Sequence, residues 1–169
     1  DYAKGIITTE TIKAIQEVAR PDTIIALDPK PRPSISYTGL SVMTPNRSEA
    51  IKLAGITEED YKEFPAEIVC KRIYEKYAPE NLIVTLGADG MLLSEKGEVI
   101  SKVPTYAREV FDVSGAGDTV IASLCVALAT GASMLDAIHF ANTAAGFVVG
   151  KIGTATATPD DIIAYASHK

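Results

Sequence analysis

The sequence has little cysteine, no long apolar run and no excess of positive charge. Cys70 and Cys125 are its two cysteines; they form no CxxC pair and neither has a histidine nearby. This spacing excludes a disulfide framework and argues against a zinc site. Both thiols fall in predicted helices among apolar neighbours, so we predict that both are buried, reduced and typical of a cytoplasmic protein.

Neither the hydropathy nor the charge of the sequence indicates a membrane or nucleic-acid partner. The most apolar stretch, 120–129, is about half of the ~20 residues that a membrane-spanning helix needs. Residues 1–5 show no basic-then-apolar leader pattern. With 16 basic and 22 acidic residues the net charge is −6, so long-range attraction to nucleic acid or to anionic lipid is not expected. We expect a cytoplasmic protein in which local donors hold any bound phosphate.

What is present is an alternation of helical and extended periodicity. Apolar residues make up 47% of the 169 residues, enough to stabilise a folded domain. The pattern predicts helices at 9–20, 46–54, 66–77, 116–130, 134–149 and 159–167. It predicts strands at 23–27, 40–44, 82–86, 91–94 and 99–103, the last two forming a hairpin with its turn at Gly97. This order indicates an α/β fold with a mostly parallel sheet and helices on both faces.

Three local patterns refine this picture. Asn46 and Glu49 have the spacing of a capping box, and Gly55 would end the helix that they open. Residues 28–39 hold three prolines and are predicted to form an ordered loop at the carboxyl end of a strand, where open α/β sheets bind ligands. The acidic run 58–60 is interpreted as a solvated helix start, and His168 as a frayed end.

The most informative segment for chemistry is Asp112-Val-Ser-Gly-Ala-Gly-Asp118, which precedes a long apolar helix. Gly115 and Gly117 allow a tight turn, and the helix start directs free N–H groups and a positive dipole end to the same place. Together these features make an anion site without Lys or Arg. Asp118 would be placed to take a proton from an attacking hydroxyl. The alternative is an ordinary glycine-rich helix start with an acidic residue at its favourable end.

Other nucleotide-binding motifs do not fit. Residues 146–151 have the spacing Gly-x-x-x-Gly-Lys, which is too short for a P-loop, and Ile152 occupies the position of the metal-binding Ser or Thr. No G-x-G-x-x-G segment follows a predicted strand, which disfavours a dinucleotide-binding domain.

Four segments in order resemble the ribokinase (PfkB) family of carbohydrate kinases. Asp112–Asp118 resembles the family's second signature, and Asn46-Arg-Ser-Glu49 its Asn-x-x-Glu motif. Residues 85–90, Thr-Leu-Gly-Ala-Asp-Gly, resemble its nucleotide-side loop, and Asn142–Phe147 lies where the family has its adenine-pocket helix. Five further segments (1–5, 28–30, 44–46, 108–112 and 149–154) resemble the kinase domain of ADP-heptose synthesis enzymes. Ser123 and the loop 31–33 depart from the patterns of these two groups.

The resemblance implies a reaction. These enzymes use ATP to phosphorylate D-glycero-β-D-manno-heptose 7-phosphate at the anomeric oxygen, and the product is used in lipopolysaccharide core or S-layer glycan assembly. Asp118 would be the general base, and the amides of Gly115, Ala116 and Gly117 would stabilise the charge on the transferred group. Another sugar or a nucleoside as substrate is the alternative within the family, and a non-catalytic nucleotide-binding module is the alternative outside it.

The resemblance also assigns binding roles. Asn46 and Glu49 would organise Mg²⁺, through water, although the same residues satisfy a capping box. Thr85, Gly87, Gly90 and Asn142 would contact the nucleotide; the alternatives are a strand end with a turn and, for Asn142, a helix-packing amide. Lys30 would reach a phosphate or be a solvated loop lysine.

The remaining residues of interest have separate assignments. Asp112, with the main chain near Gly153, would hold a monovalent cation. Lys151 would reach a phosphate or be solvated, and Tyr2 and Lys4 would face the cleft, while Asp1, the first residue, has no clear role. His139 is predicted to pack against its helix neighbours.

The resemblance covers nearly the whole chain but only the second half of the family's domain. Residues 1–169 would therefore be the C-terminal, nucleotide-binding portion of a ribokinase-like kinase domain. We expect such a chain to expose apolar surface and to associate with itself or with the missing N-terminal half.

Overall fold

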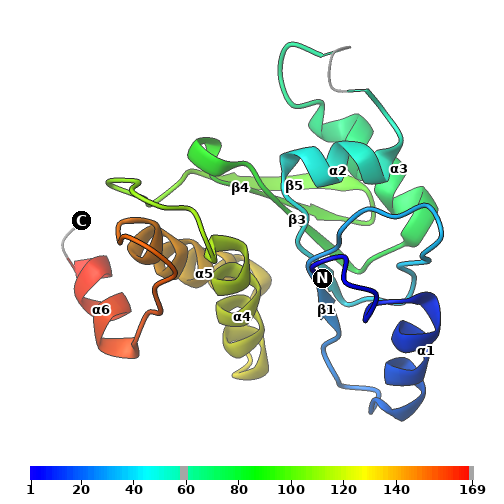
Figure 1. Cartoon of the computed structure of the whole chain (residues 1–169), viewed down its shortest axis with the longest axis horizontal. Helices are drawn as coiled ribbons and strands as arrows, with labels where there is room; N and C mark the ends of the chain where they lie inside the picture. The colour runs from blue at the N-terminus through cyan, green and yellow to red at the C-terminus, as the bar shows by residue number, and fades with distance from the viewer. Residues whose placement is uncertain (58–60, 168–169) are drawn as a thin grey trace. The chain divides into compact units, whose positions relative to one another are not determined.

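The computed structural model describes residues 1–57 and 61–167, so the predictions for the acidic run 58–60 and for His168 lie outside the described residues. The order of elements follows the predicted alternation of helix and strand (Figure 1). The helices are α1 (Thr9–Val18), α2 (Arg47–Ala54), α3 (Ala66–Tyr77), α4 (Ala116–Ala129), α5 (Met134–Val149) and α6 (Pro159–Ser167). The strands are β1 (Ala26–Leu27), β2 (Val42–Met43), β3 (Asn81–Thr85), β4 (Met91–Glu95) and β5 (Glu98–Val103), and a 3-10 turn, η2 (Gly87–Asp89), joins β3 to β4.

The five strands form one sheet in the order β1-β2-β3-β4-β5. β1 pairs in parallel with β2, and β2 in parallel with β3, with Val42 opposite both Ala26 and Asn81. β4 and β5 form the predicted hairpin, whose turn residues Lys96 and Gly97 both have positive φ, as a two-residue hairpin turn requires. The fold is therefore α/β with a mixed sheet, in which β1–β3 are parallel and the hairpin is antiparallel.

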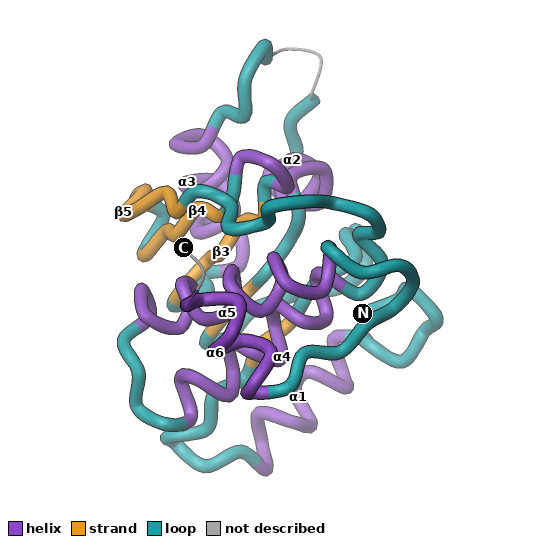
Figure 2. Tube along the Cα trace, turned by 90° about the vertical axis from the view of Figure 1, so that its left-hand side faces the viewer, coloured by secondary structure: helices purple, strands orange, loops and turns teal. Residues whose placement is uncertain are grey.

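The chain divides into two compact units. The first comprises residues 1–85 and 92–101, and its core contains the buried residues of β2, β3 and α3. The buried residues of α3 are Val69, Cys70, Ile73 and Tyr77, and the rest of the helix is at least partly exposed. These four residues form one stripe, as expected of a helix that packs on a sheet. Helix α2 packs beside α3 and contacts β3 (Figures 1 and 2).

The second unit comprises residues 86–91 and 102–169. Its centre is the α4–α5 pair, and α6 packs on α5 (Figure 1). Small buried residues on α5, among them Ala137, Ala141 and Ala144, allow the two backbones to approach closely. Only Val120 and Leu124 are buried on α4, although this helix is apolar along most of its length.

Two predictions are corrected by the structure. The predicted buried strand 23–27 contains only the two residues of β1, and Ile24 is 37% exposed. β1 lies at the edge of the described sheet with β2 as its neighbour, so its apolar run is not covered as a central strand would be. Cys70 is buried as expected, but Cys125 is only partly buried because α4 turns Val120 and Leu124, not Cys125, into the core.

Candidate functional site

In the first unit, the predicted site residues lie at the carboxyl ends of the parallel strands. Lys30 follows β1, Asn46 follows β2 and Thr85 ends β3. An isolated parallel bridge pairs Asn46 with Thr85, and the Thr85 N–H donates to the Pro45 carbonyl at 3.0 Å. The structure therefore brings Thr85 beside the start of α2, at the edge of the sheet where open α/β folds bind their ligands.

Asn46 and Glu49 form the predicted capping box. The Glu49 N–H donates to Asn46 Oδ1 at 3.0 Å, and the Asn46 N–H donates to Glu49 Oε2 at 2.8 Å. Gly55, with φ +65°, ends the helix as predicted. The capping interpretation is thus confirmed, and the metal role of the same two residues stays a prediction.

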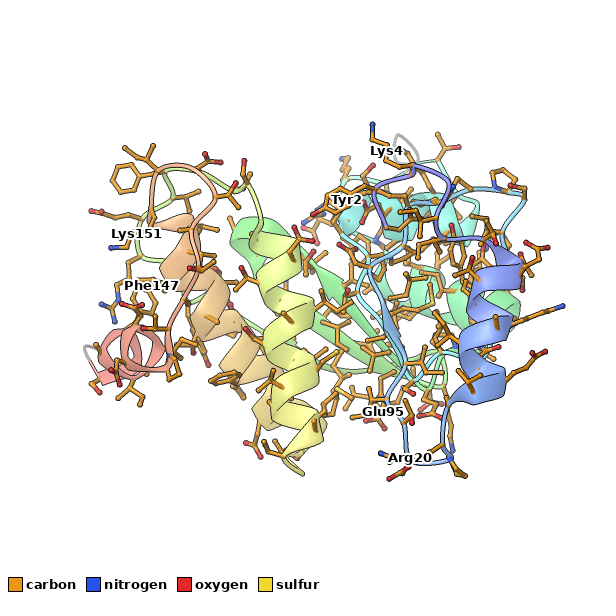
Figure 3. The ribbon with its side chains drawn as sticks, turned by 60° about the horizontal axis from the view of Figure 1, so that its bottom comes forward. Tyr2, Lys4, Arg20, Glu95, Phe147 and Lys151 are labelled. Carbon is orange, nitrogen blue, oxygen red and sulfur yellow. The ribbon has the colours of Figure 1, made fainter. Side chains whose placement is uncertain are left out.

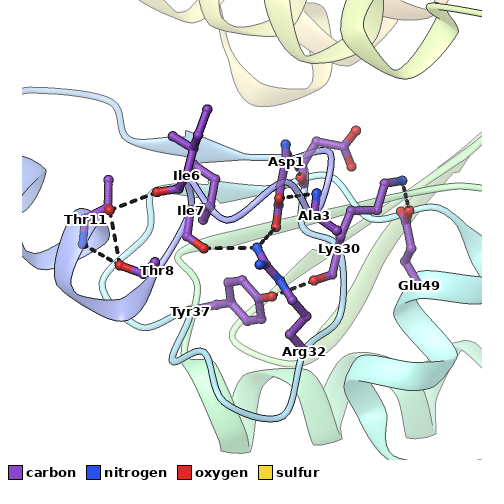
Figure 4. Close-up of polar contacts among 11 residues, drawn as sticks. Asp1, Ala3, Ile6, Ile7, Thr8, Thr11, Lys30, Arg32, Tyr37 and Glu49 are labelled. Carbon is purple, nitrogen blue, oxygen red and sulfur yellow. Dashed lines mark hydrogen bonds and ion pairs between the residues drawn. The ribbon is translucent and has the colours of Figure 1, made fainter.

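The capping box has a third member that the sequence did not indicate. The Lys30 ammonium forms an ion pair with Glu49 Oε1, and the Glu49 residue is only 7% exposed (Figure 4). Burial of a carboxylate costs free energy unless a partner compensates its charge. Lys30 supplies that compensation, so it is a partly buried residue with a defined position instead of a solvated loop lysine.

Residues 28–38, which carry Lys30, are anchored by the N-terminal segment (Figure 4). Arg32 Nη2 donates to Asp1 Oδ2 at 2.7 Å and to the Ile7 carbonyl at 3.0 Å. The Asp1 side chain is 2% exposed, and the Asp1 backbone nitrogen donates to the Asp28 carbonyl at 3.1 Å. Asp1 therefore has a structural role that the sequence did not reveal, because nothing local links it to Arg32.

In the second unit, the segment 112–118 forms the predicted turn before α4. Gly115 is the N-cap residue with φ +78°, and a Cβ at this position would lie 3.1 Å from Thr154 Cγ2. Only glycine adopts this conformation without strain. Because the N-cap residue has no side chain, it supplies no side-chain oxygen to the N–H groups of the first turn of α4.

Asp118 lies in this first turn and is exposed to solvent. The Ala116 N–H donates to the Val113 carbonyl at 3.1 Å, so this amide already takes part in the turn. Of the three amides predicted to stabilise a transferred group, Ala116 therefore contributes to the shape of the loop in this structure. The geometry combines a helix N-terminus, a glycine N-cap and an accessible carboxylate, a combination suited to an anion and to proton removal beside it.

Asp112 connects this turn to the segment after α5. Its Oδ1 accepts from the Ser114 N–H at 2.9 Å, and its Oδ2 accepts from the Gly153 N–H at 3.2 Å. The hydrogen bonds from Ser114, with a smaller contribution from Gly153, hold the pKa of Asp112 below its ordinary value. The predicted proximity of Asp112 and Gly153 is confirmed, and the monovalent cation stays a prediction.

Gly87 and Gly90 shape the loop between β3 and β4. Both have positive φ, and the Leu86 N–H donates to the Gly90 carbonyl at 2.8 Å. A Cβ on Gly90 would lie 2.0 Å from the Val103 carbonyl oxygen, whereas a Cβ on Gly87 would meet nothing within 4 Å. Gly90 is therefore required for close backbone packing, and Gly87 for the turn alone.

Asn142 is buried on α5 and holds the segment after β5. Its Nδ2 donates to the Pro104 carbonyl at 2.7 Å, and its Oδ1 accepts from the Tyr106 N–H at 3.4 Å. The Asn142 residue is 3% exposed. These contacts fit the helix-packing alternative, so any contribution of Asn142 to a nucleotide pocket would be through the position of residues 104–106.

A cluster of side chains that the sequence did not indicate holds the same segment. The Tyr106 ring stacks on His139, and the Tyr106 hydroxyl lies 2.7 Å from His139 Nδ1. The Tyr165 hydroxyl donates to the Tyr106 carbonyl at 3.0 Å and accepts from the Arg108 N–H at 3.1 Å. The Arg108 guanidinium lies 4.2 Å from the centre of the Tyr165 ring. His139 therefore packs as predicted, and no local pattern marks Tyr106 or Tyr165. Arg108 lies in the segment 108–112 named for its resemblance, but nothing in that segment indicates its contact with Tyr165.

The remaining candidates are surface residues. Lys151 lies over the Phe147 ring, with Nζ 4.9 Å from its centre (Figure 3). Tyr2 and Lys4 are exposed, and Tyr2 is 70% exposed (Figure 3).

The matches to known proteins agree with this geometry. The model of the pfkB family of carbohydrate kinases matches residues 6–161. The chain belongs to this family.

Individual proteins and solved structures of known name are also similar to this chain. The bifunctional proteins HldE of Pelobacter propionicus and Geobacter sulfurreducens are 42% and 41% identical over 96% of this chain. The chain spans 33% of the length of each. The ribokinase structure from Thermotoga maritima matches 96% of this chain and 55% of its own, with a TM-score of 0.80 and 27% identity. An Arabidopsis thaliana ribokinase complexed with ribose and ATP matches 93% of this chain and 51% of its own, with a TM-score of 0.72 and 25% identity.

These structural matches place the chain in the ribokinase-like fold. No helix within residues 1–57 and 61–167 is both long and apolar enough to cross a membrane.

Proposed function

We propose that residues 1–169 are the C-terminal, nucleotide-binding portion of an ATP-dependent sugar kinase domain. The observation that carries this proposal is the start of α4, where Gly115 opens the helix without a capping side chain and Asp118 lies exposed in the first turn. Family membership supports the kinase chemistry. The shares of 55% and 51% of the two ribokinase chains support the assignment as part of a larger domain.

The proposed substrate is D-glycero-D-manno-heptose 7-phosphate, phosphorylated at the anomeric hydroxyl in ADP-heptose biosynthesis. The similarity to HldE proteins at 41–42% identity supports this choice over other sugars. A different sugar or a nucleoside is the alternative substrate, since ribokinases share the fold at lower identity.

In this proposal Asp118 is the general base. Its carboxylate accepts the proton of the sugar hydroxyl while that oxygen forms a bond to the γ-phosphorus of ATP. The bond from the γ-phosphorus to the bridging oxygen breaks, and ADP leaves with the electron pair. The positive end of α4 and the amides of Gly115 and Gly117 stabilise the negative charge that builds on the transferred group, while the Ala116 amide shapes the turn.

We assign nucleotide binding to Lys30, Thr85, Gly87, Gly90 and Asn142. Lys30 offers an ammonium to a phosphate, and Thr85 and Gly87 place backbone and hydroxyl groups at the carboxyl end of β3. Gly90 and Asn142 act on the nucleotide indirectly, because the contacts of both are with the segment 103–106.

Mg²⁺ fits the capping box only through water. One Glu49 oxygen accepts from Lys30 and the other from the Asn46 N–H, which leaves a further lone pair on each oxygen for water bound to a metal. Within the described part of the chain, no three His, Cys, Asp or Glu side chains form a cluster that would hold a metal by themselves. Mg²⁺, when bound, would neutralise charge on the phosphates. Asp112 is the candidate for a monovalent cation.

The test is phosphoryl transfer by the full-length polypeptide that contains this sequence. ATP with Mg²⁺ would be supplied with heptose 7-phosphate, fructose 6-phosphate, ribose or adenosine, and ADP release would be measured for each. We expect the highest kcat/KM with heptose 7-phosphate. Preference for another sugar would keep the kinase and reject the substrate, and no transfer to any of them would reject the proposed function.

A further inference from the structure

Lys30 is held both at its backbone carbonyl and at the tip of its side chain. The Lys30 carbonyl accepts a hydrogen bond from the Tyr37 hydroxyl at 2.7 Å, and Tyr37 is fully buried (Figure 4). The Lys30 ammonium is held by Glu49 Oε1. The backbone and the tip of this side chain are therefore both attached, although the side chain is 39% exposed and can still meet a ligand.

The capping box does not explain why residue 49 is charged. The cap needs one oxygen on the side chain at this position, and glutamine supplies it as well as glutamate does. Here Oε2 accepts from the Asn46 N–H, which leaves Oε1 for Lys30. The charge of a carboxylate that is only 9% exposed is compensated by Lys30, so the two roles of Glu49 reside on two different oxygens.

We propose that Glu49 is a positioning residue for Lys30. It orders the ammonium at the carboxyl end of β1, so that Lys30 meets a phosphate group of the substrate or nucleotide without first losing rotamer freedom. A lysine side chain is among the most flexible, and ordering it on binding lowers affinity. This inference deepens the proposed function, on which its ligand class rests.

The kinetic test is a double-mutant cycle in the full-length polypeptide with Glu49→Gln and Lys30→Gln. Glu49→Gln keeps an oxygen for the cap but loses the carboxylate. We expect it to raise the KM of a phosphate-bearing substrate about tenfold, the order expected when one free side chain must be ordered on binding, with a smaller change in kcat. In the Lys30→Gln background the same substitution should change KM by less than about twofold, because the ammonium that Glu49 would position is absent.

Equal effects of Glu49→Gln in both backgrounds would overturn the proposal, since Glu49 would then act through the cap or a metal alone. The matched control is Glu75→Gln, the same chemical change in an exposed ion pair with Lys71. It should leave KM unchanged in both backgrounds.

A second measurement does not depend on activity. Ammonium groups held by a carboxylate exchange protons slowly enough for proton–nitrogen NMR at low temperature, and Lys30→Gln would identify the signal of Lys30 in the 169-residue chain. We expect this signal in the wild type and after Glu75→Gln, and its loss after Glu49→Gln. A Lys30 ammonium equally mobile in the wild type and in Glu49→Gln would reject the proposal, whether or not the polypeptide proves to be a kinase.

Discussion

Gly90 and Gly131 illustrate two different requirements for glycine, a positive φ angle and close backbone packing. Their φ angles are nearly the same, +89° and +88°. A Cβ on Gly90 would lie 2.0 Å from the Val103 oxygen and 2.7 Å from two atoms of residues 104 and 105, whereas a Cβ on Gly131 would meet nothing within 4 Å. Gly90 therefore carries both a conformational and a packing requirement, and Gly131 only the first.

Gly131→Ala should lower the free energy of unfolding by about 1–2 kcal/mol, the cost of the left-handed conformation. Gly90→Ala should cost a further ~1–3 kcal/mol because backbone must move to admit the methyl group. Urea denaturation followed by circular dichroism measures both. Equal losses would mean that the segment 103–105 moves aside without cost.

For single residues, the sequence predicts local turns and helix caps better than it predicts contacts between residues far apart in the chain. The glycine turn before α4 and the capping box follow from local spacing, and the structure contains both. The Lys30–Glu49 and Arg32–Asp1 pairs join residues 19 and 31 positions apart, and no local pattern encodes such distances. The resemblance assigns Asn142 to the nucleotide, but its contacts are with the Pro104 and Tyr106 backbone.

Helix α6 begins with a reciprocal cap between Thr158 and Asp161. The Thr158 N–H and hydroxyl both donate to Asp161 Oδ2, at 2.9 and 2.6 Å, and the Asp161 N–H donates to Thr158 Oγ1 at 3.2 Å. The hydrogen bonds from Thr158 hold the pKa of Asp161 below its ordinary value of 3.8. Asp161 therefore stabilises the folded state most when it is ionised.

The sign of the pH dependence follows from this lowered pKa. The contribution of Asp161 is fully present above pH 3.8 and is lost as the pH falls through the lower pKa of the folded state. Asp161→Asn should make the fall in unfolding free energy between about pH 5 and about pH 2 smaller. Asp160→Asn removes the same charge from the same turn and should leave that fall closer to the wild type. Urea denaturation across this pH range distinguishes the two variants, and equal slopes would contradict the assignment to Asp161.

Element boundaries follow from sequence where local signals are strong. The predicted bounds of α3, α5 and α6 match the structure, and α2 begins one residue after its predicted start, because Asn46 is its N-cap residue. Asn46 and Ser133 cap the starts of α2 and α5, whereas Pro65 gives the start of α3 no side-chain cap. The strand predicted at 23–27 is mostly loop, since the length of an edge strand depends on its neighbour and not on its own apolar run.

Helix α4 has an exposed apolar face within the described chain. Val120 and Leu124 are buried, but Val126 is 60% exposed and the helix has no charged residue after Asp118. An exposed face of this kind normally meets another surface. In the proposed function that surface belongs to the remainder of the kinase domain, which the 169-residue chain does not contain.

The isolated chain should therefore associate with itself at micromolar concentration, and Val126→Glu should weaken this association. Ile163→Glu on α6, at a position of similar exposure (64%), should have less effect. Sedimentation velocity over a range of concentrations measures both. A chain that remains monomeric throughout would contradict the expectation.

We propose that Asp118 removes the proton from the sugar hydroxyl. Its most direct test compares Asp118→Asn with the wild type in the full-length polypeptide, with ATP and Mg²⁺ and the best sugar of the panel. We expect a loss in kcat of about 10²–10⁴-fold, the usual contribution of a general base, with little change in the KM for ATP. Asp22→Asn, the same change at a position where the side chain is 80% exposed, should leave kcat unchanged. A near-normal kcat for Asp118→Asn would contradict the claim.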